Sequence, residues 1–117
     1  MPTRRQRKVS ELIQKEICQI LQKEIGDPRL NLVTVTSVEI SPNLRQAHVY
    51  VTTMGGEEKR EAALEGLQHA TGFFRRELGA RLYLRYVPEI TFHLDDSYER
   101  GQRVEQLLEQ IEAKREG

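Results

Sequence analysis

The sequence predicts a single α+β domain, in which a layer of helices packs on one face of a small sheet. The patterns along the chain run helix, strand, strand, helix, break, helix, strand, helix. A strand pair joined through a helical crossover to another strand places its helices on one sheet face, which gives two layers. The length of 117 residues suits one such domain, spanning residues 1–117 with one core.

The first element is an amphipathic helix that begins after Thr3 and stops at Gly26. Thr3 and Gln6 have the spacing of a capping box, and Gly26 followed by Pro28 is a stop signal. Apolar residues recur every three or four positions, as in a helix with one buried face; they are Val9, Leu12, Ile13, Ile17, Ile20, Leu21 and Ile25.

Cys18 is the single cysteine, so an intramolecular disulfide is excluded and a reducing, cytoplasmic compartment is expected.

Two strands are predicted next, over residues 32–40 and 45–54, with a turn at Ser41-Pro42-Asn43. In the second strand one face should be buried, because apolar Ala47, Val49 and Val51 alternate with His48, Tyr50 and Thr52. The outward rings of His48 and Tyr50 either stack on RNA bases or simply cover an exposed sheet face.

A helix over residues 57–78 follows and is interrupted at Ala70-Thr71-Gly72. An interior glycine costs about 1 kcal/mol relative to alanine and loosens the backbone, so we expect Gly72 to divide the helix in two. Gly79 should end the second piece, since glycine readily takes the left-handed conformation just past a helix. The apolar stripe continues through the break at Ala63, Leu67, Ala70, Phe74 and Leu78.

A third strand is expected near residues 87–94, with Pro88 at its start or on a sheet edge because proline lacks an N–H. Asp95-Asp96-Ser97 then resembles a helix N-cap and opens an acidic amphipathic helix over about 97–113. In the strand, Ile90, Phe92 and Leu94 should point inward, and Thr91 and His93 outward.

Charge is balanced in total and segregated along the chain. Basic and acidic residues both number 18, which argues against a protein that coats nucleic acid through overall charge. The first eight residues nevertheless carry four bases and no acid, at a helix N-terminus where cations are unfavourable. An anionic partner would explain these bases, which are Arg4, Arg5, Arg7 and Lys8; otherwise they are solvated at a chain end.

Several stretches together resemble the bacterial ribosome-binding factor A family over about residues 3–110. The most specific pair is Ala70-Thr71-Gly72 at the interhelical bend with Val87-Pro88-Glu89 in the last strand. The resemblance implies a type II K-homology domain, αββααβ plus a C-terminal helix. It also implies a cytoplasmic, non-catalytic factor that binds the small ribosomal subunit precursor, assists late maturation and 5′-end processing of its RNA, and supports growth in the cold. The matching stretches are residues 28–30, 33–38, 47–51, 70–75, 82–85 and 87–92.

RNA-binding K-homology domains clamp the RNA backbone with a Gly-x-x-G loop, and this sequence contains none. The family's Ala-x-Gly bend, at Ala70 and Gly72, stands in its place, so recognition should depend on charge and shape. Arg75 could instead pair with Glu77 on a solvated helix face. The expected contact residues are Arg4, Arg5, Arg7, Lys8, Arg45, Arg75, Arg76, Arg81 and Arg85, beside the bend residues Ala70, Thr71 and Gly72.

Two other function classes compete with RNA binding. An enzyme is disfavoured, because Cys18 and the three histidines, His48, His69 and His93, have no zinc-ligand spacing, and neither a phosphate loop nor a nucleophile motif occurs. No cofactor or metal is therefore expected. A protein-interaction module would use the acidic last helix to bind a ribosomal protein or an assembly GTPase. No apolar run reaches the roughly 20 residues of a membrane span. We also expect the protein to be a monomer.

Overall fold

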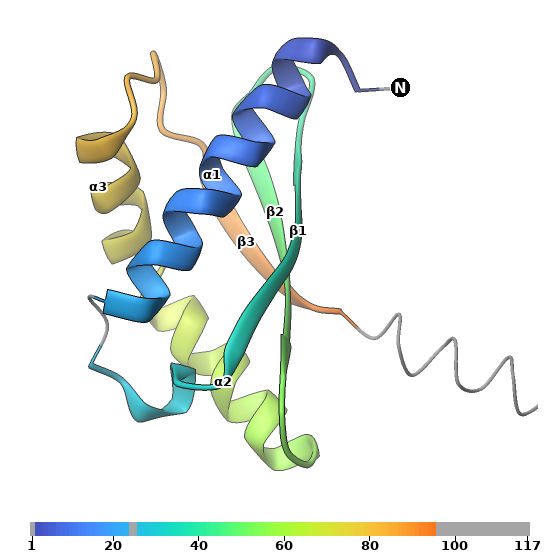
Figure 1. The fold of residues 1–117 in the computed structure, drawn as a ribbon, viewed down its shortest axis with the longest axis vertical. Helices are drawn as coiled ribbons and strands as arrows, with labels where there is room; N and C mark the ends of the chain where they lie inside the picture. The colour runs from blue at the N-terminus through green and yellow to red at the C-terminus, as the bar shows by residue number, and fades with distance from the viewer. Residues whose placement is uncertain (1, 24–25, 96–117) are drawn as a thin grey trace, which may run out of the picture.

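The computed structural model describes residues 2–23 and 26–95, and Figure 1 shows their arrangement. The predicted acidic helix at about 97–113 lies outside these residues, as does Ile25. The order of elements is α1 (Arg4–Lys23), η1 (Pro28–Leu30), β1 (Val33–Ile40), β2 (Gln46–Thr53), α2 (Glu57–His69), α3 (Thr71–Arg81) and β3 (Glu89–Leu94). The predicted α+β class and the order of its helices and strands are confirmed over this part of the chain.

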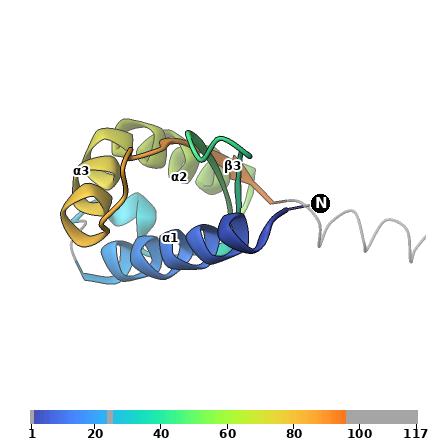
Figure 2. The same ribbon diagram turned by 90° about the horizontal axis from the view of Figure 1, so that it is seen from above.

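The three strands form one sheet in the order β1-β2-β3, with β1 antiparallel and β3 parallel to β2. The helices of the described residues cover one face of this sheet (Figure 1). Seen from above, α1 and α2 run along opposite sides of the molecule and α3 lies at one end between them (Figure 2). The α2–α3 crossover allows β2 and β3 to pair in parallel, because parallel strands need a long connection.

The core lies between the helices and the inward sheet face. The expected alternation in β2 is confirmed, because Ala47, Val49 and Val51 are fully buried. The Phe74 ring of α3 packs on Phe92 of β3, with ring centres 5.1 Å apart. The helical stripe of α1 contributes Val9, Ile13, Ile17 and Ile20 to the same cluster.

The predicted capping box at the start of α1 is confirmed. The Thr3 backbone N–H donates to Oε1 of Gln6 at 2.8 Å, and the Gln6 N–H donates to Oγ1 of Thr3 at 3.1 Å. Gln6 is also buried, and its Nε2 donates to the carbonyl oxygen of Ile40 at 3.2 Å. One side chain therefore caps α1 and fastens it to the end of β1.

The predicted break between the two helices is present, but Gly72 is not its cause. The break lies at Ala70, whose φ of −89° and ψ of 3° end α2 and begin α3. Gly72 lies inside α3, does not have a positive φ, and has open space where a Cβ would stand. Thr71 contributes to the break, since its hydroxyl donates to the carbonyls of Leu67 and Gln68 at 3.2 and 2.9 Å.

Gly79 does not end the second helix, contrary to expectation. α3 continues to Arg81, and Leu82 follows in an extended conformation. A Cβ on Gly79 would lie 3.1 Å from Cγ2 of Val87. Glycine is therefore favoured there because the loop after α3 returns close to the helix.

Candidate nucleic-acid interface

Four of the predicted contact residues, Arg5, Arg45, Arg75 and Arg85, gather at one end of the domain, where the first turns of α1, the β1–β2 turn and the α3–β3 loop meet. We call this region the basic end, and Figure 1 shows the α3–β3 loop and the start of α1 at the same end of the molecule. Two hollows, of about 300 and 330 Å³, lie there and share Asn43 and Tyr86. The first is lined by Arg5, Val9, Pro42, Asn43, Leu44, Tyr83, Leu84, Arg85 and Tyr86, and the second by Asn43, Arg45, Gln46, Arg75, Tyr86, Val87 and Glu89.

Tyr86 lies at the centre of the basic end. The guanidinium carbon of Arg45 is 4.8 Å from the centre of its ring, and that of Arg85 is 5.6 Å away. At these distances the ring attracts both cations without neutralising them. The arrangement therefore keeps positive charge at the surface and beside an aromatic ring.

The β1–β2 turn positions Arg45 through its backbone. Oδ1 of Asn43 accepts hydrogen bonds from the Ser41 hydroxyl at 2.6 Å and from the Arg45 N–H at 3.1 Å. Leu44 has a φ of 62°, a left-handed conformation that is uncommon for residues other than glycine. Because Leu44 also packs against the core cluster, its side chain offsets this strain.

Arg75 bonds to the α3–β3 loop instead of to an acid. Its Nε donates to the carbonyl oxygen of Pro88 and its Nη2 to that of Val87, both at 3.2 Å. The alternative of an Arg75–Glu77 pair is not what the structure shows, since Glu77 lies 3.5 Å from Arg81. The Arg75 side chain stays exposed and keeps its charge available.

Arg81 is enclosed by acids. Its Nη1 lies 3.4 Å from the Glu16 carboxylate of α1, and its Nε lies 3.5 Å from that of Glu77. These ion pairs join α1 to α3 across a partly buried boundary. The structure therefore favours a packing role for Arg81 over contact with a partner.

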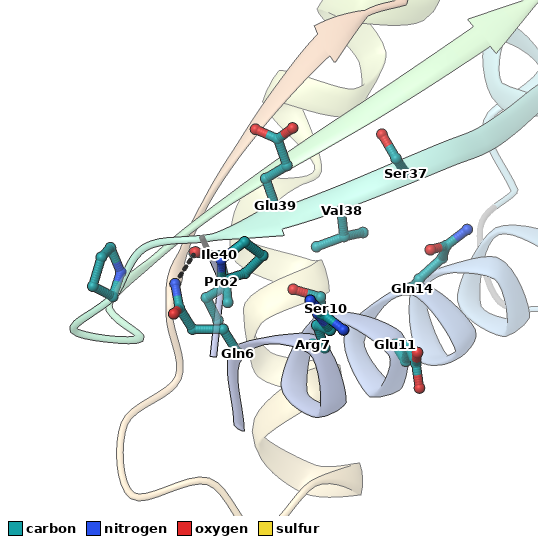
Figure 3. A pocket seen from close by; sticks show the side chains of 11 residues that line it. Pro2, Gln6, Arg7, Ser10, Glu11, Gln14, Ser37, Val38, Glu39 and Ile40 are labelled. Carbon is teal, nitrogen blue, oxygen red and sulfur yellow. Dashed lines mark hydrogen bonds between the residues drawn. The ribbon is translucent and has the colours of Figure 1, made fainter. Parts of the chain in front are cut away.

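The remaining predicted contact residues point in several directions. Arg7 lines a groove of about 510 Å³ between α1 and β1, and is thereby separated from Arg5, which faces the first hollow. Figure 3 shows this groove, with Gln6 bonded to Ile40 at one end. Arg4, Lys8 and Arg76 are exposed on α1 and α3. The nine predicted residues thus do not form one cluster.

The groove in Figure 3 carries charges of both signs. Glu11 of α1 and Glu39 of β1 line it together with Arg7. Two acids and one base along a groove give little net attraction for a polyanion. This groove is therefore a weaker candidate for RNA than the basic end.

The interhelical bend lies at the other end of α3 from the basic end. α3 runs from Thr71 to Arg81, which corresponds to about 16 Å of helix. Arg75 lies one turn from the bend, whereas Arg85 lies on the loop beyond the far end of α3. The sequence predicts that four arginines lie near the bend, namely Arg75, Arg76, Arg81 and Arg85. This expectation is wrong for Arg81, the last residue of α3, and for Arg85, on the loop beyond it.

Tyr83 and Tyr86 were not among the predicted site residues. Tyr83 is fully exposed at 108%, and Tyr86 is 54% exposed. The sequence does carry a signal for them, since both tyrosines alternate with basic residues in Arg81-Leu82-Tyr83-Leu84-Arg85-Tyr86. Basic residues interleaved with aromatic ones are typical of single-strand RNA binding.

The predicted outward rings of the sheet contact one another. Nδ1 of His48 lies 2.9 Å from Nε2 of His93, and the Tyr50 ring stacks on His93 with centres 5.1 Å apart. All three side chains are half-buried. Mutual packing therefore uses ring surface that base stacking would need.

The described residues offer no site for a metal ion. Within residues 2–23 and 26–95, no group of three or more His, Cys, Asp and Glu side chains could hold one. Cys18 is half-buried in α1, and burial raises the pKa of its thiol above the usual range. None of the described helices is long and apolar enough to cross a membrane.

Comparison with known proteins decides the family. The family model for ribosome-binding factor A matches residues 5–108. The chain belongs to the ribosome-binding factor A family. Ribosome-binding factor A of Thermomicrobium roseum is 47% identical over 116 residues, a match that covers 99% of this chain and 90% of the relative. The predicted family resemblance is thereby confirmed.

A crystal structure and a fitted homology model of ribosome-binding factor A from Thermus thermophilus share the fold. The crystal structure is 27% identical with a TM-score of 0.69, covering 76% of this chain and 94% of the other. A homology model of that protein, fitted into an electron cryo-microscopy map of its complex with the 30S subunit, is 28% identical with a TM-score of 0.63. It covers 74% of this chain and 91% of the other.

Proposed function

We propose that this protein is a cytoplasmic, non-catalytic assembly factor that binds the small ribosomal subunit precursor. In that role it assists late maturation of the subunit, 5′-end processing of its RNA, and growth in the cold. The single observation that carries the proposal is the basic end. There Arg5 and Arg85 line a hollow that has no acidic lining residue, in a chain whose family binds ribosomes.

The contact surface extends beyond the basic end in this proposal. The whole chain acts as one K-homology-like domain, with basic residues 1–8 and the Ala70-Thr71-Gly72 bend facing RNA. Gly72 supports this, because no contact or backbone angle in the described structure requires glycine there. A residue without a side chain allows an RNA backbone to come close.

A binding protein of this kind can promote maturation without chemistry. It shifts the folding equilibrium of the RNA only by as much as its affinity differs between the two RNA arrangements. Gln6, Arg75 and the core fasten the helices and the α3–β3 loop to the sheet, which supports a domain that holds one shape against the RNA. A ribosomal protein or an assembly GTPase is a further expected partner, through the acidic segment at about 97–113.

Co-sedimentation tests the proposal. The protein is mixed with precursor small subunits, mature small subunits, large subunits or assembled ribosomes, and the pelleted fraction is measured at matched particle concentrations. We expect pelleting with small subunits, and more with precursors than with mature ones. Equal pelleting with large subunits, or none with small subunits, would contradict the proposal.

A further inference from the structure

The α3–β3 loop presents a large aromatic side chain entirely to solvent. Tyr83 is 108% exposed, which makes it the most exposed of the large apolar side chains in the described residues. A ring left in water forgoes the burial that stabilises most tyrosines, and exposed aromatics on rigidly held loops mark binding sites.

The loop itself is held in place. Leu82 and Leu84, on either side of Tyr83, pack against the core cluster and direct the tyrosine outward. Further along the loop, Pro88 is buried and Arg75 bonds to its carbonyl oxygen. The ring of Tyr83 is therefore presented by a fixed backbone and not by a free chain end.

Two cations share a hollow with this ring, and no acid lines that hollow. Arg5 and Arg85 line the same hollow as Tyr83, and none of its lining residues is acidic. Within residues 2–23 and 26–95, no ion pair engages Arg5 or Arg85. An exposed aromatic ring and two such guanidinium groups along one hollow match a nucleotide, in which a flat base lies between phosphates.

We propose that Tyr83 is a stacking platform for an unpaired RNA base, and that Arg5 and Arg85 bind the phosphates on either side of that base. The inference rests on the proposed function and adds the class of RNA recognised. The base is unpaired because bases inside a duplex already stack on both faces. Recognition is tolerant of sequence, since every base has an aromatic face.

Photo-crosslinking on intact small subunits tests the contact. A Tyr83→p-benzoylphenylalanine variant of the full chain is bound to small subunits and irradiated. We expect a crosslink to a ribosomal RNA nucleotide outside the base-paired helices. Met54→p-benzoylphenylalanine is the matched control, because Met54 is 73% exposed and comes directly after β2, whereas Arg45 of the basic end comes directly before that strand. A Tyr83 crosslink to a ribosomal protein, to paired RNA, or to nothing would overturn the inference.

Substitutions distinguish stacking from simple apolar contact. Tyr83→Phe keeps a flat ring and should bind small subunits within about two-fold of the original protein. Tyr83→Leu keeps apolar bulk without a ring, and Tyr83→Ala removes both, so each should bind at least about five-fold more weakly. Equal binding by Tyr83→Leu and Tyr83→Phe would overturn the stacking role. If the unaltered protein also failed to bind small subunits, the proposed function would fail with it.

Discussion

Nε of Arg75 lies 3.2 Å from the carbonyl oxygen of Pro88. This hydrogen bond joins the first half of α3 to the residue that precedes β3, 13 positions further along the chain. Arg75 therefore fixes the loop that carries Tyr83 and Tyr86. Arg75 is itself expected to contact RNA, and it thus also positions neighbouring residues that would contact the RNA.

Replacing Arg75 should lower stability as well as binding. Arg75→Ala removes the donors to the Val87 and Pro88 carbonyls, and we expect the free energy of unfolding to fall by about 1 kcal/mol. Urea denaturation measures this change. Arg76→Ala is the matched control, because its side chain is exposed and the same charge is removed. Equal stability of the two variants would show that the loop bonds contribute nothing.

The capping box offers a second test of stability. Thr3→Ala removes one cap bond and should cost about 1 kcal/mol. Gln6→Ala removes the reciprocal bond and also leaves the Ile40 carbonyl without its donor, so it should cost more, about 2 kcal/mol. Thermal or urea unfolding of the two variants gives the comparison. A smaller loss of stability for Gln6→Ala than for Thr3→Ala would contradict the tie between α1 and β1.

Two glycines of α3 should respond to alanine in opposite ways. Gly72→Ala meets open space in a helical backbone, so the free energy of unfolding should rise by up to about 1 kcal/mol. Gly79→Ala should destabilise the fold, because its Cβ would lie 3.1 Å from a Val87 methyl group on a loop held by Arg75.

Measuring small-subunit binding by Gly72→Ala distinguishes an effect of this substitution on stability from an effect on function. If RNA approaches the bend, Gly72→Ala should bind small subunits more weakly even though its unfolding midpoint is unchanged or higher. Small-subunit affinity and urea midpoint are measured on the same preparation. If Gly72→Ala binds small subunits with undiminished affinity, the bend is not part of the contact surface.

Acid should weaken one local contact at the start of η1. Hydrogen bonds from the Arg29 side chain and backbone lower the pKa of Asp27 below its ordinary value of 3.8. A lowered pKa in the folded state means that the carboxylate stabilises the fold above pH 3.8, and that this contribution disappears as pH falls through the lowered pKa.

Asp27→Asn isolates that contribution. The variant should be less stable than the original protein at pH 7, and the difference should shrink as pH falls below 3.8. Urea unfolding at several pH values measures it, with Asn31→Asp as a control for added charge nearby. A difference that stayed constant with pH would contradict ionisation as its source.

The sequence was sufficient to predict the elements whose patterns are local. The stripe of α1, the alternation in β2 and the Thr3–Gln6 cap depend on neighbours within a few residues. The alternation and the cap are confirmed, and so is the stripe at Val9, Ile13, Ile17 and Ile20, whereas Leu12 is 38% exposed, contrary to expectation. The fold class followed from the order of these elements and from the rule for crossover connections. The strand ends differ from the predicted ones by one or two residues.

What could not be predicted depends on contacts between distant residues. Arg81 reaches Glu16 across 65 positions, which converts an expected RNA contact into an ion pair between helices. The His48–His93 contact forms only because β2 and β3 pair in one register. The exposure of Tyr83 likewise depends on how its loop packs, so the interleaving with arginine alone did not single it out.

The salt dependence of binding to small subunits tests the central claim most directly. Affinity is measured over a salt series for the original protein, for Arg5→Ala/Arg85→Ala, and for Lys15→Ala/Lys23→Ala, which removes two exposed charges elsewhere on α1. Log affinity decreases as log salt increases. We expect this dependence to become less steep by roughly one unit for each arginine–phosphate interaction removed, and in the arginine variant only. Equal slopes for all three proteins would contradict the claim that the basic end binds ribosomal RNA.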